Sequence, residues 1–289
     1  MMPLVALLRP RDWVKNALVL APLLFGAKLF DADAVGRAML AALAFCLAAS
    51  AGYVWNDLAD READRRHPVK RKRPLAAGTV KAAHAVTVSL VSLGGAVGLA
   101  GLVGTPVVVC VVVYVALAAA YSAWLKHIAI IDVLGIGAFY ILRVLVGSVA
   151  IGVPASHWLL IATGLLAVFL GLCKRRHELV LLGGEAAEHR EVLGRTGRRF
   201  LDAAISLTTS TTLIAYLLYA LSPETVAKFD GRGMLAGAPF VFYGLLRYLH
   251  LVYTEGRGGS PTELVATDPG VLAAAAGFAI TCGVVIYFV

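Results

Sequence analysis

AVGRAMLAALAFCLAASAGYVWNDLADREAD, residues Ala34 to Asp64, joins a long apolar run directly to a cluster of acidic side chains. The run is long enough to cross a bilayer, since a membrane-spanning helix needs about 20 mainly apolar residues. We expect this helix to cover 34–57 and to end where Asn56 and the aspartates begin. The stretch therefore predicts a membrane-spanning helix with a polar site at one end.

The rest of the chain has the same character. Its 289 residues are 60% hydrophobic and 15% charged, and a mean hydropathy of +0.81 excludes an ordinary soluble domain. Cutting the chain at its polar and turn-forming segments predicts nine spanning helices, at 13–30, 34–57, 82–103, 106–124, 129–151, 157–176, 201–221, 234–253 and 270–289. We expect an all-α, multi-pass membrane protein in which residues 1–289 form one integral-membrane domain.

Basic residues are distributed unevenly between the predicted loops. If the N-terminus is cytoplasmic, 21 of the 26 Lys and Arg residues lie on the cytoplasmic side, many of them in two long polar loops at 58–81 and 177–200. Such a bias sets the orientation of membrane proteins, so we expect the N-terminus and both loops in the cytoplasm. The net charge of +8 then reflects a cation-lined membrane face and implies no nucleic-acid partner.

The aspartates of the opening stretch are spaced for a shared site. Asp57, Asp60 and Asp64 stand at i, i+3 and i+7, which places their carboxylates within about 60° on one helix face. Asn56 adds an amide oxygen beside them. Carboxylate and amide oxygens suit a hard cation such as Mg²⁺, which also shares substrate phosphates.

A basic loop follows the acids. Pro68 and Pro74 stop any helical continuation, so the four cations between them, Lys70, Arg71, Lys72 and Arg73, can fold back over the carboxylates. Metal-bound acids beside bases are typical of a diphosphate site. The alternative is a solvated helix end where acids are simply followed by bases. Acids this close to the membrane favour the functional interpretation.

The motif Asn56-Asp57-x-x-Asp60-x-x-x-Asp64 resembles the NDxxDxxxD motif of the intramembrane UbiA prenyltransferase superfamily. Its extension, DRRHPVKRKRPLAAG at 64–78, is similar to the polyprenyl-phosphate phosphoribosyltransferase branch. Four further stretches agree with that branch, in order along the chain: RPRDWVKN (9–16), YSAWLKHIAIIDV (121–133), YILRVLVG (140–147) and KRRHEL (174–179). The resemblance implies a UbiA-type helical bundle in the bacterial inner (cytoplasmic) membrane, with its active site on the cytoplasmic side.

The resemblance also implies a reaction, the transfer of 5-phosphoribose from phosphoribosyl pyrophosphate to a polyprenyl (decaprenyl-type) phosphate. Pyrophosphate would be released, and the product would serve as a lipid-linked sugar precursor for the cell envelope. The implied cofactor is Mg²⁺, held by Asn56, Asp57, Asp60 and Asp64, with Asp57, Asp60, Asp64 and Lys126 as catalytic residues. The implied substrate-binding residues are Lys15, Asn16, Arg65, Lys70, Arg71, Arg73, Tyr121, Arg143, Lys174, Arg175 and Glu178. The partners are then both substrates and membrane lipid, and a homo-oligomer is compatible with the sequence.

One departure from the family pattern bears on the substrate. Members of the superfamily that act on aromatic acceptors carry a second acidic motif, DxxxD, after the sixth helix, where this chain has Lys174, Arg175, Arg176 and Glu178. A basic site suits a substrate with more phosphate groups. Two other functions stay open: prenyl transfer from a diphosphate to an aromatic acceptor, and transport of an anionic solute.

Several residues of the predicted site also have a plainer interpretation. Lys126 can be a lysine that reaches from a helix end to the membrane surface, and Lys15 with Asn16 can anchor the first helix. Arg143 lies within a spanning helix, where it either contacts substrate or belongs to a structural ion pair. The spacing of Gly94, Gly98, Gly101 and Gly104 predicts close helix packing.

Overall fold

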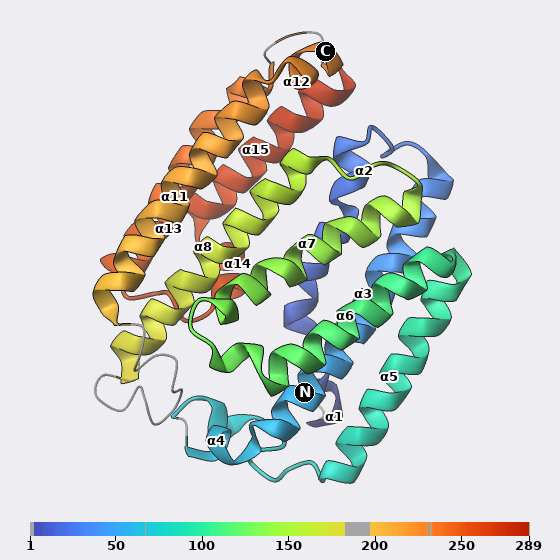
Figure 1. Ribbon diagram of the computed structural model, residues 1–289, viewed down its shortest axis with the longest axis vertical. Helices are drawn as coiled ribbons and strands as arrows, with labels where there is room; N and C mark the ends of the chain where they lie inside the picture. The colour runs from blue at the N-terminus through green and yellow to red at the C-terminus, as the bar shows by residue number, and fades with distance from the viewer. Residues whose placement is uncertain (1–2, 67, 183–196, 230, 232, 289) are drawn as a thin grey trace.

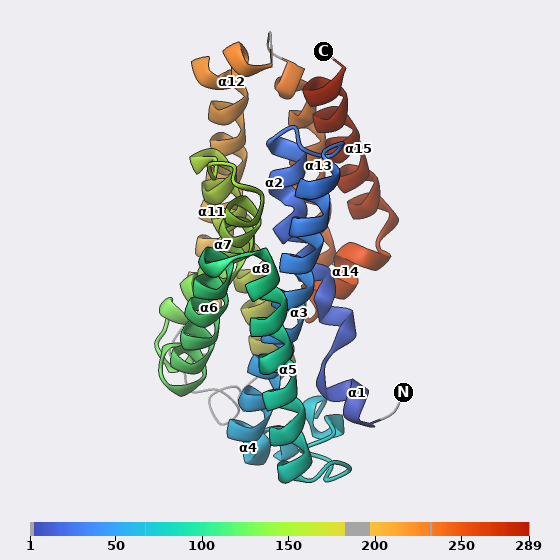
Figure 2. The ribbon, with the colours of Figure 1, turned by 90° about the vertical axis from the view of Figure 1, so that its right-hand side faces the viewer.

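The computed structural model describes residues 3–66, 68–182, 197–229, 231 and 233–288, and helices are the only regular elements within them (Figures 1 and 2). Eight helical segments are long and apolar enough to cross a membrane. They are α3 (Ala32–Ala59), α5 (Ala82–Val103), α6 (Thr105–Ala123), α7 (Ile131–Ile151), α8 (His157–Leu182), α11 (Arg198–Leu221), α13 (Ala238–Tyr253) with η5 (Gly233–Gly237) before it, and α15 (Pro269–Tyr287). The chain is therefore an all-α, multi-pass membrane protein, as its composition predicts.

The first predicted span, 13–30, is built differently from the others. It consists of the 3-10 helix η1 (Pro10–Leu20) and the short helix α2 (Ala21–Phe25), and it packs along α3 and α7 (Figure 2). Pro10 and Pro22 lie in the first turns of these two elements and lack the N–H that a continuous α-helix needs. With the eight long segments of the described residues, this broken segment makes the prediction of about nine spans roughly consistent with the structure.

Glycine permits the close contact between this broken segment and α7. A Cβ atom on Gly147 would lie 2.0 Å from the carbonyl oxygen of Val19, so any side chain there would push the two backbones apart.

The glycines of α5 are expected to pack closely against another helix, and most of them do not. Added Cβ atoms on Gly94, Gly98 and Gly101 would have no described heavy atom within 4 Å, and the predicted close packing is wrong for these three.

The α3 helix lies at the centre of the N-terminal half and sets the position of the acidic motif. It packs against α5, α6, α7 and η1. Small side chains such as Ala41, Ala44 and Ala48 are fully buried in this contact and let the helices approach closely. Close packing of the helix body leaves its C-terminal end, with the aspartates, projecting toward one end of the bundle.

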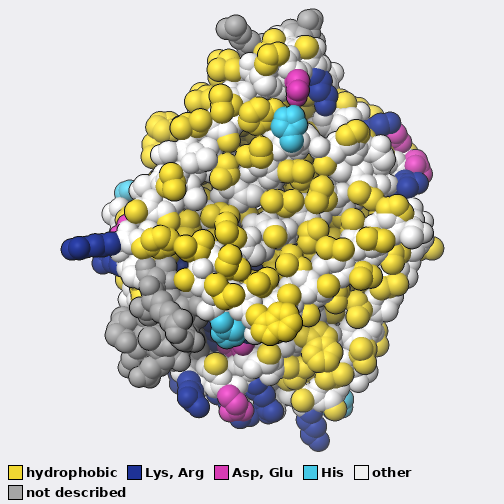
Figure 3. All heavy atoms as spheres, in the orientation of Figure 1, with side chains coloured by type: hydrophobic (Ala, Val, Ile, Leu, Met, Phe, Trp, Pro, Cys, Tyr) yellow, Lys and Arg dark blue, Asp and Glu magenta, His cyan; other side chains and the backbone are white. Residues whose placement is uncertain are grey.

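That end of the bundle, which we call the polar end, carries the short elements of the predicted site. These are α1 (Pro3–Leu7), α4 (Arg61–Arg66), η2 (Lys70–Lys72) and η3 (Leu125–His127), toward the bottom of Figure 1. Two other short helices lie elsewhere: α12 (Pro223–Lys228) is at the top of Figure 1, and α14 (Pro261–Thr267) precedes α15. Charged side chains lie around the periphery of the face shown in Figure 3, most of them at the bottom, and apolar side chains cover its middle. This apolar middle matches the hydrocarbon layer of a membrane.

The second polar loop is shorter than predicted. The α8 helix continues to Leu182, and α11 begins at Arg198, so both ends of the predicted loop 177–200 are helical. Residues 183–196 of that loop lie outside the described part of the chain.

Candidate active site

The acidic motif keeps its helical spacing through a break in the chain. The α3 helix ends at Ala59 and α4 begins at Arg61, but the N–H of Asp60 donates to the carbonyl of Asn56 at 2.9 Å. The N–H of Asp64 donates to the carbonyl of Asp60 at 2.8 Å. Because these bonds continue the helical path, the three carboxylates stay together at the polar end.

Each of the three carboxylates contacts a cation from another segment. Nη1 of Arg73 lies 3.0 Å from Oδ1 of Asp57 and 2.7 Å from Oδ2 of Asp64. Nζ of Lys126, on η3, lies 2.6 Å from Oδ1 of Asp60. The basic loop therefore returns to the acids through Arg73, and Lys126 lies beside Asp60. We call these residues, with Asn56 and Arg9, the acid cluster.

The structure adds Arg9, which the sequence did not single out, and places beside the cluster Ser122, which the family resemblance offered as a donor next to Lys126. Arg9 contacts Asp57 and lies over the ring of Tyr53, with 5.0 Å between its Cζ and the ring centroid. Its backbone is left-handed, with φ 50°, a conformation that non-glycine residues adopt mainly where the surroundings impose it. Ser122 donates to Oδ1 of Asn56 at 3.3 Å. Arg9 belongs to the stretch 9–16 that resembles the family, which is the one signal that could have identified it.

The acid cluster contains the donor types that suit a hard cation, although within the described ranges no three His, Cys, Asp or Glu side chains are arranged so that they alone could hold a metal ion. Asp57 and Asp64 share one cationic nitrogen of Arg73, so a positive charge can be held between them. The amide of Asn56 donates to Asp60 at 3.1 Å, which keeps a further carboxylate nearby. These donors are all oxygens, and Mg²⁺ usually completes such a partial set with water and phosphate.

Charge and burial act against each other in this cluster. Burial raises the pKa of the Asp64 carboxyl, and the neighbouring Arg73 and Lys70 offset this only in part. For Arg9, burial alone would lower the pKa, but the facing Asp57 carboxylate outweighs it and raises the pKa of the guanidinium. Arg9 therefore stays charged, whereas Asp64 ionises less readily than an ordinary aspartate.

A second cluster lies where α6, α7 and α8 meet, and we call it the Arg175 cluster. Nε of Arg175 lies 2.7 Å from Oδ2 of Asp132, and its Nη1 lies 2.7 Å from Oε2 of Glu178. Nη2 donates to the hydroxyl of Tyr121 at 3.4 Å. All three charged groups are buried. The strained residue Ile130, with φ 71°, immediately precedes the helix that presents Asp132.

Lys174 precedes this arginine on α8 and has a different environment. It is half-buried, and it makes no hydrogen bond or ion pair with the described residues. The charges that act on it include Glu178 and Arg175 from its own helix and Lys15 and Lys70 from two other segments. Lys174 therefore lies on the side of α8 that is influenced by Lys15 and Lys70, without an ion-pair partner among the described residues.

A third cluster lies deeper in the bundle, around Arg143. Its Nε donates to Oδ1 of Asn16 at 2.7 Å, and its Nη2 donates to the hydroxyl of Tyr114 at 3.1 Å. Its Nη1 donates to the carbonyl of Phe139 at 2.7 Å. No carboxylate pairs with this buried guanidinium in the part of the chain that the structure describes, so the predicted alternative of a structural ion pair is not observed there.

Some predicted substrate-binding residues lie apart from these clusters. Arg65 pairs with Glu62 at 2.8 Å and donates to the carbonyl of Ala76 at 3.3 Å, which directs it away from the acids. The side chain of Arg71 is exposed. Lys15 pairs with Asp12 at 2.6 Å beside the cluster. The structure therefore brings Lys126 and Arg73 to the acids and leaves Arg65 and Arg71 outside.

A helical membrane bundle whose NDxxDxxxD motif meets cations at one end has the architecture of the intramembrane prenyltransferases. Comparison of sequences makes the assignment definite. The UbiA prenyltransferase family matches residues 18–261, and the chain belongs to this family.

Named relatives and solved structures agree with this assignment. The decaprenyl-phosphate phosphoribosyltransferase of Mycobacterium tuberculosis is 34% identical over 294 residues, which cover 98% of this chain and 94% of the relative. The enzyme of the same name from Corynebacterium glutamicum is 33% identical over 270 residues, 92% of this chain and 81% of the relative. A UbiA homolog from Archaeoglobus fulgidus, solved bound to GPP and Mg²⁺, has the same fold, with a TM-score of 0.74 at 18% identity over 98% of this chain and 99% of that one.

Proposed function

We propose that the chain transfers 5-phosphoribose from phosphoribosyl pyrophosphate to a polyprenyl phosphate and releases pyrophosphate. The observation that carries the proposal is the acid cluster, in which carboxylates at the end of α3 contact cations from three other segments. Such an arrangement suits a diphosphate bound through a metal ion. The names of relatives that match nearly the whole chain support phosphoribose as the transferred group.

The residues of the acid cluster would bind different parts of the donor substrate, phosphoribosyl pyrophosphate. Bound Mg²⁺, held by Asn56, Asp57, Asp60 and Asp64, would neutralise charge on the leaving diphosphate. Arg73 and Lys126 already lie within 3.0 Å of the carboxylates, so they can donate to diphosphate oxygens placed against the same acids. Arg9, which lies between α1 and η1 and contacts Asp57, can also donate to diphosphate oxygens. The chain thus supplies cations where negative charge develops, which is the main requirement of such a transfer.

The acceptor needs little activation. In the transfer, the bond from the anomeric carbon to pyrophosphate breaks, and pyrophosphate leaves with the electron pair. A bond from the same carbon to an oxygen of the lipid phosphate forms. Because a phosphate monoester is already an anion at neutral pH, no general base is required, and the site needs only to position it.

Lys174 is well placed to bind an anionic group of either substrate. Arg175 is held by Asp132 and Glu178, so its charge is already compensated within the protein. Lys174 lacks such a partner among the described residues and lies within the electrostatic influence of Lys15. We infer that the basic segment in place of a second acidic motif contributes two fixed cations, Arg175 and Arg176, and one lysine, Lys174, without a described partner.

The proposal includes the orientation and extent of the functional unit. The polar end would face the cytoplasm, because 21 of the 26 Lys and Arg residues fall on that side of the predicted topology. Residues 1–289 would act as one unit, since the acid cluster draws on α3, η3 and the segment before η1. A homo-oligomer and a bacterial inner-membrane location are part of the same proposal.

The test is a pyrophosphate-release assay on the full chain in detergent. One arm supplies phosphoribosyl pyrophosphate with a polyprenyl phosphate, and the other supplies a polyprenyl diphosphate with an aromatic acceptor, each with Mg²⁺ or with a chelator. We expect Mg²⁺-dependent release in the first arm only. Release in the second arm alone would assign the chain to aromatic prenyl transfer, and release in neither arm would contradict both activities.

A further inference from the structure

One buried hydroxyl in the bundle has no hydrogen-bond partner. It belongs to Tyr248 on α13, which is 3% exposed, and in the part of the chain that the structure describes it is the one fully buried side-chain oxygen or nitrogen without a partner. A buried polar group that lacks a hydrogen bond destabilises a fold, so native structures retain few of them, and those few commonly contact water, an ion or a ligand. The hydroxyl of Tyr248 is therefore a candidate binding group.

The packing of Tyr248 does not require its hydroxyl. The ring meets the ring of Phe169 on α8 edge to face, with 5.4 Å between the centroids. Leu245 from the same helix and Leu172 from α8 belong to the same buried apolar cluster. A phenylalanine would make these ring contacts without burying a polar atom. The fold thus gains from the ring of Tyr248 and loses from its hydroxyl.

The two other buried tyrosines of the described chain both pair their hydroxyls with protein groups. The hydroxyl of Tyr216 donates to the carbonyl oxygen of Met234 at 2.6 Å. The hydroxyl of Tyr114 accepts from Nη2 of Arg143 at 3.1 Å. Tyr248 differs from both, because its hydroxyl keeps its capacity to donate and to accept for a molecule from outside the chain.

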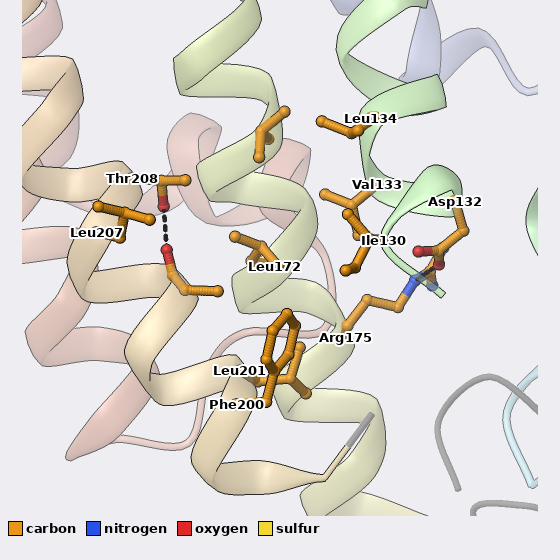
Figure 4. Close-up of a pocket in the computed structure, with 12 residues that line it drawn as sticks. Ile130, Asp132, Val133, Leu134, Leu172, Arg175, Phe200, Leu201, Leu207 and Thr208 are labelled. Atoms are coloured by element: carbon orange, nitrogen blue, oxygen red, sulfur yellow. Dashed lines mark hydrogen bonds and ion pairs between the residues drawn. The ribbon is translucent and has the colours of Figure 1, made fainter. Parts of the chain in front are cut away.

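The hydroxyl of Tyr248 lies toward the interior between α7 and α8. The ionisable groups that act on it are Cys173 on α8 and Tyr140 on α7. Tyr140 is only half-buried, so the interior beside the hydroxyl is not closed off. The carboxylate that α7 presents to α8, Asp132, is paired with Arg175 at 2.7 Å and does not accept from Tyr248 (Figure 4).

The interior beside Tyr140 carries positive charge. Cζ of Arg143 lies 5.4 Å from the centroid of the Tyr140 ring, and Lys15 of η1 is the charge that acts on Tyr140 most strongly. Lys15 pairs with Asp12, whereas Arg143 has no carboxylate partner among the described residues. One positive charge is therefore left uncompensated, and a hydroxyl donor near such a charge suits an anion.

We propose that the hydroxyl of Tyr248 donates a hydrogen bond to a phosphate monoester of a substrate. The inference rests on the proposed function, whose two substrates each carry such a group: the 5-phosphate of phosphoribosyl pyrophosphate and the phosphate of the polyprenyl phosphate. Hydrogen bonds to an anion are stronger than those between neutral groups. The bound phosphate therefore recovers the stability that the unpaired hydroxyl costs the free protein.

Binding and thermal unfolding of Tyr248→Phe in detergent test the inference without requiring turnover. The probes are polyprenyl phosphate and ribose 5-phosphate, which carries the 5-phosphate without the diphosphate, and they are titrated separately so that the two sources are distinguished. We expect Tyr248→Phe to bind one of them about tenfold more weakly than the wild type. Without ligand the variant should unfold about 2 °C higher, because a buried unpaired hydroxyl has been removed.

Tyr216→Phe is the matched control, because it removes a buried hydroxyl that has a protein partner. It should unfold at a lower temperature than the wild type and bind both probes with unchanged affinity. Equal affinity of Tyr248→Phe and the wild type for both probes overturns the inference, as does a wild type that binds neither. A lower unfolding temperature of Tyr248→Phe, or its failure to fold in gel filtration, also overturns it, because either result shows that the fold depends on the hydroxyl.

Steady-state kinetics separates this inference from the proposed function. In Tyr248→Phe we expect the KM of the affected substrate to rise about tenfold with kcat nearly unchanged, because the contact is made before and during the transfer. Wild-type KM values in an active Tyr248→Phe refute the role of the hydroxyl and retain the reaction. A wild type that releases no pyrophosphate, but binds a probe more tightly than Tyr248→Phe does, refutes the reaction and retains the phosphate contact.

Discussion

The acid cluster and the Arg175 cluster contain the same chemistry in different surroundings. Both lie at the polar end, one after α3 and the other near the end of α8, and both pair carboxylates with cations at 2.6–3.0 Å. In the acid cluster the side chain of Arg73 is 27% exposed, whereas that of Arg175 is 6% exposed. Partly exposed pairs can exchange partners with a ligand, and buried pairs cannot do so without a large cost.

The origin of the cations reinforces this difference. Arg73 and Arg9 come from loop segments outside the long helices, so they can move without disturbing helix packing. Arg175, Asp132 and Glu178 come from two packed helices, which fix their positions. We therefore propose that the acid cluster exchanges its cations with substrate and that the Arg175 cluster has a structural role.

The largest expected effect is the loss of activity in Asp57→Asn. The substitution removes a carboxylate that contacts two cations and leaves the side-chain volume nearly unchanged. We expect turnover to fall about 10³-fold, because charge stabilisation at the diphosphate is lost, while expression and elution in gel filtration stay normal. Glu62→Gln, at an exposed acid on α4, is the matched control and should keep wild-type turnover. Near-normal pyrophosphate release by Asp57→Asn would remove the acid cluster from the reaction.

The next effect concerns stability and distinguishes the buried cluster. Arg175→Met leaves Asp132 and Glu178 without their shared cation, and we expect a loss of about 3–5 kcal/mol in the free energy of unfolding. Thermal unfolding in detergent measures this loss. A variant as stable as the wild type would show that the Arg175 cluster is not structural.

The matched substitution in the acid cluster should affect stability less. Arg73→Met removes a partly exposed guanidinium, and we expect the free energy of unfolding to change by less than about 1 kcal/mol. Turnover should nevertheless fall, since the donor loses a phosphate contact. Arg66→Met, at an exposed residue of α4 outside the cluster, serves as the control for both measurements. A stability loss equal to that of Arg175→Met would abolish the contrast between the clusters.

The smallest expected effect concerns the pH dependence of kcat/KM. Because burial raises the pKa of Asp64 above its ordinary value of 3.8, acidification protonates it earlier than an exposed aspartate. A protonated Asp64 cannot share a cation, so kcat/KM should fall on the acid side at a higher pH than for an ordinary carboxyl. The fold itself gains slightly from this group as pH falls through that window, because its folded pKa lies above the unfolded one. Activity should therefore fall before the protein unfolds.

Arg73 influences the pH at which kcat/KM falls on the acid side, which we call the acid limb. Its charge lowers the pKa of Asp64, so in Arg73→Met the limb should move to higher pH. Profiles of kcat/KM against pH for both proteins measure the shift. An unchanged limb would mean that Asp64 is not the group that titrates.

The fold could be predicted from the sequence because long apolar runs are a strong signal. Eight of the nine predicted spans correspond to continuous helices or, for 234–253, to η5 and α13 together. The form of the first span could not be predicted, because it depends on a tertiary contact. Its 3-10 geometry is fixed by prolines together with the close approach to Gly147 on α7.

The candidate site was predictable to the extent that it is local in sequence. The spacing of the aspartates and the prolines around the basic loop indicated the acid cluster and the return of Arg73. The partners that sequence reasoning missed are distant along the chain: Arg9 is 48 residues from Asp57, and Asp132 is 43 residues from Arg175. Helical periodicity relates only neighbouring turns, so such pairs appear only after the helices pack.

The central claim is that this chain attaches phosphoribose to a lipid phosphate. Mass spectrometry of the lipid fraction, after incubation of the full chain with phosphoribosyl pyrophosphate, polyprenyl phosphate and Mg²⁺, tests it most directly. We predict a lipid whose mass has increased by one phosphoribosyl group, formed in step with pyrophosphate and absent with Asp57→Asn. An unchanged lipid, or the same product from Asp57→Asn at the wild-type rate, would contradict the account.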